Sequence, residues 1–208
     1  MTDDGYWSEV TELRLRIADL LADLSPMEWD ADSLCAGWRI RDVAGHLSIV
    51  PTITTWQLMA AAPRGGFDMN RINTLVAVRH GSRPTAEIVQ AIRAHATARR
   101  TARVLDVRNS LFDLIVHSQD IALPLGRDFG VRPAVTRRGL ERVWSMGFPF
   151  KASQRLAGLT LAANDTDWRV GDGPPVEGPA LPLLLLLTGR TAAARPHLTG
   201  GGVELLPR

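Results

Sequence analysis

Cysteine, lysine and long apolar runs are scarce in this 208-residue sequence. It has one cysteine, Cys35, and one lysine, Lys151. A single cysteine cannot form an internal disulfide, and no basic segment followed by an apolar one opens the chain, so we expect a cytoplasmic protein. The longest apolar run, residues 180–187, contains a proline and is far shorter than the roughly 20 residues that span a bilayer. We therefore expect no membrane anchor.

A concentrated basic surface is also absent. The formal net charge is +2, and the arginines that supply nearly all the positive charge are scattered among acidic residues. Proteins that bind nucleic acids need a concentrated basic face, so this class is not expected despite a sequence pI near 9.3. Apolar residues make up 45% of the chain, which is enough to bury a core. The composition is typical of a folded, soluble protein of one domain or two small ones.

Apolar residues recur at three- and four-residue steps through the first 150 residues, which predicts helices. Ser25-Pro26 ends the first of them, and Pro124 with Gly126 ends the fifth. The predicted helices cover residues 7–24, 40–50, 72–78, 85–99, 104–123 and 134–146. The pattern favours a mainly α domain over residues 1–150.

The pattern changes after residue 150. Short apolar segments separated by Asp and Gly predict strands or short helices, followed by one apolar helix and a last strand. These segments are 156–163, 167–170, 174–178, 181–190 and 203–206. We therefore predict a small α+β domain over residues 151–208.

Three polar side chains lie on the predicted inward faces of helices. Asp113 and His117 are four residues apart, so on a helix both can reach one point, and His46 lies on a second helix. Two histidines and one carboxylate are typical of a catalytic divalent-metal site that keeps positions open for water or substrate. The spacing alone leaves other interpretations open: a chance Asp-x3-His pair, a hydrogen-bonded core histidine, or an Asp113 that only orients His117.

Two segments resemble a known family. LCAGWRIRDVAGHL, starting at Leu34, and FDLIVHSQDIALPLG, starting at Phe112, are similar to the mycothiol-dependent maleylpyruvate isomerase family, a branch of the DinB/YfiT-like superfamily. VEGPALPLLLLLTGR extends the resemblance into the small C-terminal domain, so it covers most of the chain. It implies a DinB-like four-helix bundle that holds one divalent ion, zinc or alternatively nickel, through His46, Asp113 and His117.

The sequence departs from the family pattern at two positions. The resembled isomerase has a glutamate where this chain has Asp113, and this shorter acid could shift the position or preference of the metal. Relatives commonly have Ser or Thr at the position of Arg39, which precedes the second helix. Asp42 is expected to stabilise that helix N-terminus instead.

The resemblance also implies an activity. A low-molecular-weight thiol, mycothiol, would bind at the open metal position and add to a small electrophilic substrate, as in an isomerase or a thiol S-transferase. The arginine-rich composition suits an actinobacterial source, in which mycothiol replaces glutathione. Two alternatives stay open: a metal-dependent hydrolase that uses metal-bound hydroxide, and a non-catalytic metal- or ligand-binding protein.

Three further residues are candidates near such a site. Arg190 matches an arginine of the family's small domain, and we predict that it has a catalytic role by neutralising a carboxylate; the alternative is a helix C-cap. Cys35 is either a nucleophile or, more simply, a packed loop residue. Asp120 is expected to make an outer hydrogen bond or to cap a helix.

The remaining histidines and aromatic residues are assigned structural roles. We expect solvated side chains for His80, His95 and His197, and core positions for Trp29, Trp38 and Trp144. A surface for a homodimer is one hypothesis for the segment around Trp56, and the core is the other. The residues of this segment are Trp56, Leu58 and Met59.

Overall fold

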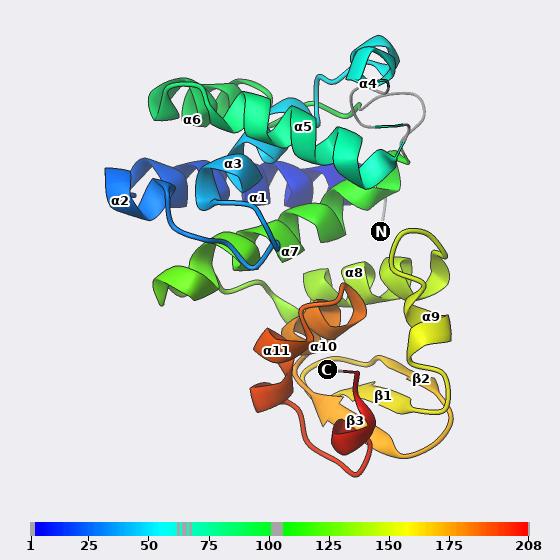
Figure 1. Ribbon diagram of the computed structural model, residues 1–208. Helices are drawn as coiled ribbons and strands as arrows, with labels where there is room; N and C mark the ends of the chain where they lie inside the picture. Colours follow the sequence, from blue (N-terminus) through cyan, green and yellow to red (C-terminus); the bar gives the residue numbers. More distant parts are fainter. Residues whose placement is uncertain (1–2, 62, 64–65, 67, 101–105, 208) are drawn as a thin grey trace. The chain divides into compact units, whose positions relative to one another are not determined.

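A computed structural model describes residues 3–61, 63, 66, 68–100 and 106–207 (Figure 1). The chain forms two compact units, residues 1–129 and 130–208. Most of the described elements are helices, and a three-stranded sheet lies in the second unit. The prediction of a mainly α protein with a small α+β region is therefore confirmed. Among the described residues no helix combines the length and the apolar character that a membrane crossing requires.

The secondary-structure elements described in the first unit are helices and 3-10 turns. Its elements are α1 (Asp3–Ala22), α2 (Pro26–Trp29), α3 (Ile40–Ile49), α4 (Thr55–Ala61), α5 (Met69–Gly81), α6 (Thr85–Ala94), the 3-10 turn Val107–Asn109, α7 (Ser110–Ala122) and the 3-10 turn Leu123–Leu125. α1 packs on α6 and α7, while α3 packs on α5, α6 and α7. This arrangement brings α3 and α7, which are far apart in the sequence, into contact.

Helix boundaries in this unit follow from local chemistry. The Ser25 hydroxyl accepts a hydrogen bond from the Glu28 amide, and the Glu28 side chain accepts one from the Ser25 amide, which is a capping box at the start of α2. At α3 the Asp42 carboxylate accepts from the Arg39 amide and side chain, so Asp42 serves the helix start as predicted. The third predicted long helix is shorter than expected, because α6 ends at Ala94 with His95 as its C-cap.

Two glycines let α3 and α5 pack closely. A Cβ atom added to Gly45 of α3 would contact the Gly81 backbone nitrogen and lie 2.7 Å from the Ala77 carbonyl oxygen of α5. A Cβ atom added to Gly81 would lie 2.6 Å from the Arg41 carbonyl oxygen. These separations are far below van der Waals contact, so only glycine fits at either position.

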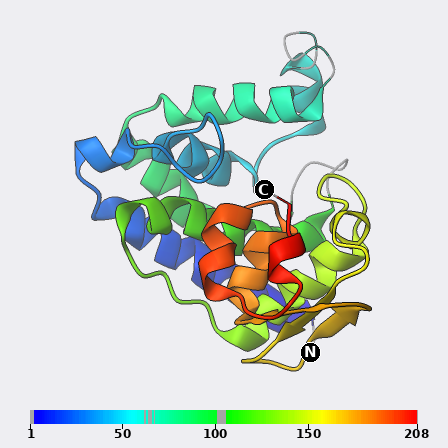
Figure 2. The ribbon, with the colours of Figure 1, turned by 60° about the horizontal axis from the view of Figure 1, so that its bottom comes forward.

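The second unit is built around one apolar helix. Its elements are α8 (Pro133–Ser145), α9 (Ala152–Arg155), β1 (Thr160–Ala163), β2 (Arg169–Gly171), β3 (Pro175–Gly178), α10 (Ala180–Leu187), α11 (Thr191–Ala194) and the 3-10 turns Arg195–His197 and Val203–Leu205. β1 lies in the middle of the sheet, antiparallel to β2 and parallel to β3. α10 contacts α8, β1 and β3. Figure 2 shows the ribbon from a second direction. The apolar composition of α10 fits its burial, because Ala180 and residues 183–187 are all buried.

The structure also differs from the sequence predictions elsewhere in the chain. The units divide after residue 129, whereas the predicted boundary was residue 150, because α8 packs on α10. The predicted last strand, residues 203–206, is wrong: Val203–Leu205 is a 3-10 turn that follows three glycines. α4 was not predicted, and the first two residues of the predicted helix 104–123 lie outside the described residues.

Candidate metal centre

α3 and α7 bring the three predicted ligands together. His46 comes from α3, and Asp113 and His117 come from successive turns of α7. One ligand atom from each of the three side chains can be chosen so that all lie within 4.8 Å of one another. The His46 Nε2 atom is 3.4 Å from Asp113 Oδ2, and the His117 Nε2 atom is 3.5 Å from Asp113 Oδ1. The three residues therefore meet at one point.

The donor set fits a divalent ion. Ligands bound to Zn²⁺ at 2.0–2.2 Å in tetrahedral geometry are about 3.4 Å apart, which is close to both separations from Asp113. The His46 Nε2 atom is buried and has no hydrogen-bond partner among the described residues. A buried ring nitrogen without a partner is costly unless something else satisfies it. Coordination of a cation by His46, Asp113 and His117 would give this nitrogen a partner.

Hydrogen bonds outside this set orient His117. Its Nδ1 atom donates to Asp120 Oδ2 over 2.8 Å, which leaves Nε2 facing Asp113. Asp120 is fully buried, and the same Oδ2 atom accepts a hydrogen bond from the Cys35 thiol over 3.1 Å. This is the imidazole–carboxylate arrangement common behind metal-binding histidines.

Trp38 forms an aromatic wall beside both imidazoles. Its ring is nearly parallel to that of His117, with centroids 6.4 Å apart, and its centroid is 5.6 Å from that of His46. The indole Nε1 atom donates to Thr74 Oγ1 of α5 over 3.2 Å, which fixes the ring. Trp38 is buried as predicted.

Charge coupling dominates the electrostatics of the three residues. Burial alone would raise the pKa of Asp113, but the charges of His117 and His46 outweigh it and hold this pKa well below its usual range. For His117 burial lowers the pKa, whereas the charge of Asp113 and the hydrogen bonds to Asp120 and Cys35 raise it well above its ordinary value. Asp113 is therefore ionised, and His117 carries a proton at neutral pH unless a cation replaces it.

The other candidate histidines differ in exposure. His197 is exposed, as predicted. His80 is half-buried and its Nδ1 atom has no hydrogen-bond partner among the described residues, while half-buried His95 uses its Nδ1 atom to contact the Ala91 carbonyl oxygen. The prediction that both are solvated is wrong, because each lies near the end of a packed helix.

Arg190 lies in the second unit, where it precedes α11. Its Nη1 atom donates to the carbonyl oxygen of Thr188, the C-cap residue of α10, over 2.8 Å. This contact agrees with the helix-capping alternative. A role toward a substrate stays a prediction.

The segment proposed as core or dimer surface is exposed where the structure describes it. Trp56 is 78% exposed and Met59 56% exposed, so neither is a core residue. The side chain of Leu58 lies outside the described part of the chain. Trp29 is buried as predicted, whereas Trp144 is half-buried.

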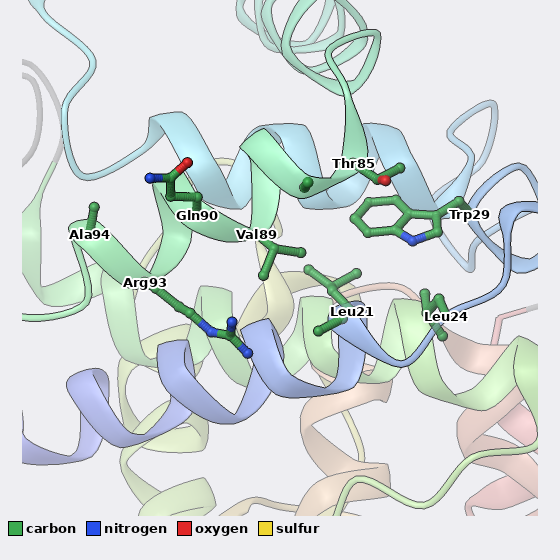
Figure 3. Close-up of a pocket in the computed structure, with 10 residues that line it drawn as sticks. Leu21, Leu24, Trp29, Thr85, Val89, Gln90, Arg93 and Ala94 are labelled. Atoms are coloured by element: carbon green, nitrogen blue, oxygen red, sulfur yellow. The ribbon is translucent and has the colours of Figure 1, made fainter.

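An open groove lies elsewhere in the first unit. It has a volume of about 640 Å³ between the end of α1 and α6, and none of the three candidate ligands lines it. Figure 3 shows Leu21 and Val89 pointing toward each other across it, with Trp29 at one side. Arg93 also lines the groove and forms an ion pair with Asp19 over 2.8 Å.

Asn73 is the residue at the site that sequence reasoning missed. Its Oδ1 atom is 3.1 Å from His46 Nδ1, on the side of the ring opposite the candidate metal position. Asn73 lies on the short helix 72–78 that the sequence predicted, but no spacing rule links that helix to His46. The glycines that bring α3 and α5 together were the available signal, because small residues mark close helix contacts.

Comparison with known proteins finds one family model that matches part of the chain. Residues 10–108 match the family model described as the mycothiol maleylpyruvate isomerase N-terminal domain. Over this segment the chain is similar to that domain. The matched segment includes His46 and ends before Asp113, so the second half of the candidate site lies outside it. No curated protein is similar enough in sequence to count as a match.

Two solved structures share the fold over the whole chain. One is a crystal structure of a mycothiol-dependent maleylpyruvate isomerase with a histidine-to-alanine mutation: TM-score 0.69, 11% identity, covering 100% of this chain and 97% of that one. The other, of mycothiol-dependent maleylpyruvate isomerase, has a TM-score of 0.63 at 13% identity and the same coverage. At these identities the similarity establishes the fold.

Proposed function

We propose that this protein is a metal-dependent enzyme that uses a low-molecular-weight thiol, mycothiol, to isomerise or to modify a small electrophilic substrate. The convergence of His46, Asp113 and His117 is the observation that carries the proposal. The family domain supports the choice of thiol, and so do the names of the two solved structures. We place the reaction in the cytoplasm, because mycothiol is expected to stay reduced there.

The three side chains would hold zinc, or alternatively nickel. Two neutral imidazoles and one carboxylate neutralise only one of the two charges of the ion, so the centre keeps a net positive charge that attracts an anionic ligand. A divalent ion held there supplies a Lewis acid that lowers the pKa of a coordinated thiol. Asp120 keeps the His117 ring in place, and Trp38 covers one side of both imidazoles. We also propose Arg190 as the group that binds a substrate carboxylate.

Turnover should depend on the thiol. We expect zinc-loaded protein to isomerise maleylpyruvate, or to consume a related activated electrophile, only when mycothiol is present, followed by absorbance or product mass. Glutathione in place of mycothiol is the control for thiol identity, and His117→Ala is the control for the metal centre. Turnover by zinc-loaded protein without any thiol would contradict the proposal and favour hydrolysis.

Metal affinity should increase with pH. The raised pKa of His117 means that a proton must leave its ring before the cation binds, so acid competes with the metal. Below that pKa the zinc affinity should rise at least tenfold per pH unit, because at least one proton is released per ion bound. Calorimetric titrations in buffers of different ionisation enthalpy measure both the zinc affinity and the number of protons released. An affinity that is independent of pH between 5 and 7 would be inconsistent with His117 as a ligand.

A further inference from the structure

Asn73 supports the candidate centre from a third helix. It lies on α5, whereas the candidate ligands lie on α3 and α7. Its Oδ1 atom is 3.1 Å from His46 Nδ1, and no other hydrogen bond of its side chain is found among the described residues. Asn73 is exposed as a whole, while His46 is only 8% exposed. An exposed amide thus reaches a buried ring.

The proton of a neutral imidazole can lie on only one of its two nitrogens. Among the described residues the Nε2 atom of His46 makes no hydrogen bond, although Asp113 Oδ2 lies 3.4 Å from it, whereas Nδ1 lies 3.1 Å from an amide oxygen, which can only accept. The hydrogen bond to Asn73 therefore favours the proton on Nδ1. This leaves the Nε2 lone pair on the side of Asp113, where a metal ligand needs it.

We propose that Asn73 is a positioning residue: its side-chain oxygen holds His46 in the Nδ1–H tautomer and so presents Nε2 to the cation. The proposal rests on the metal centre proposed above. It adds a residue outside the Asp-x3-His motif, and it gives the two histidines different supports. His117 donates to a buried carboxylate, Asp120, whereas His46 donates to a neutral amide.

The contacts around Asn73 hold it at this position. The close packing of Gly45 against Gly81 sets the distance between α3 and α5. Thr74, the next residue on α5, accepts a hydrogen bond from the indole of Trp38, which contacts the His46 ring. The backbone of α5 is therefore held at Thr74 and at Gly81, which leaves the two side-chain torsions of Asn73 free to turn.

The most informative test distinguishes the hydrogen-bond acceptor of the Asn73 side chain from the size of that side chain. Asn73→Leu keeps the size and removes the oxygen, whereas Asn73→Asp keeps an acceptor and removes the donor. We expect zinc to bind about 10- to 100-fold more weakly to Asn73→Leu and at least as tightly as wild type to Asn73→Asp. Asn70→Leu, an exposed change on the same helix, is the matched control and should bind as wild type does. Zinc affinity is measured by competition with a chromogenic chelator.

Nitrogen NMR of the histidine rings gives a readout that does not need metal. In metal-free wild type and Asn73→Asp at pH 8, His46 should carry its proton on Nδ1; in Asn73→Leu this preference should be lost. The His46→Ala spectrum assigns the signals. A wild-type ring protonated on Nε2 alone, or equal zinc affinity in Asn73→Leu and wild type, would overturn the proposal. If wild type bound no zinc, the proposed function would fail, while the ring spectrum would still decide the role of Asn73.

Discussion

Replacing Asp113 with alanine should weaken zinc binding by about a hundredfold or more. Structural zinc sites bind with about 10–16 kcal/mol over four ligands, so one ligand contributes about 3 kcal/mol. Among the described residues Asp113 is also the acid that faces both His46 and His117, at 3.4 and 3.5 Å from their Nε2 atoms. Its loss removes the only negative charge of the ligand set, so the two imidazoles would have to bind the cation without neutralising it.

Elemental analysis of protein purified without chelator or histidine tag measures this effect directly, and calorimetry gives the affinity. Asp128→Ala, which removes an exposed carboxylate in the same unit, is the matched control and should keep the zinc content of wild type. Asp113→Glu restores a carboxylate and should bind zinc more tightly than Asp113→Ala. Full zinc content in a folded Asp113→Ala protein would mean that these three residues do not form the site.

Replacing Gly45 with alanine should destabilise the first unit by about 3 kcal/mol, at the upper end of the usual cost of overpacking. The new methyl group would contact the Gly81 backbone and lie 2.7 Å from the Ala77 carbonyl oxygen, so α3 and α5 must separate. Backbone atoms cannot turn away as a flexible side chain can. A thermal melt followed by circular dichroism should show a decrease in Tm of about 10 °C.

The control for this change is Gly201→Ala. A Cβ atom added at Gly201 meets no atom within 4 Å, and its backbone is outside the left-handed region, so its melting curve should match that of wild type. Gly45→Ala should also bind zinc more weakly, since the separation of the helices draws Asn73 away from His46. An unchanged Tm in Gly45→Ala would show that the two helices can move apart at little cost.

The local features of the candidate site could be predicted from the sequence better than the packing of its helices against one another. Helical spacing alone places Asp113 and His117 on one face of a helix, because this relation depends only on residues four apart. The pairing of that helix with the one that carries His46 was an implication of the family resemblance, since single-sequence periodicity identifies buried faces but not their partners. Asn73 was missed for the same reason.

The errors in the fold have equally local causes. The apolar residues Val203, Leu205 and Leu206 suggested a strand, but the preceding glycines allow a tight turn that ends in Val203–Leu205 instead. Trp56 was a candidate core residue because tryptophans are usually buried, yet it is 78% exposed. The predicted domain boundary at residue 150 followed composition, whereas the packing of α8 on α10 places it after Phe129.

Gly45 and His46 are adjacent in the chain, so the substitutions that Gly45 can accept depend on the position that His46 needs. A substitution that widened the spacing of α3 and α5 would shift His46 on one helix and Asn73 on the other at the same time. Compensating mutations in the core could restore the melting temperature without restoring the relative positions of His46 and Asn73. We therefore expect few substitutions at Gly45 and Gly81, even in homologues that are more stable, because the His46 imidazole must keep its orientation.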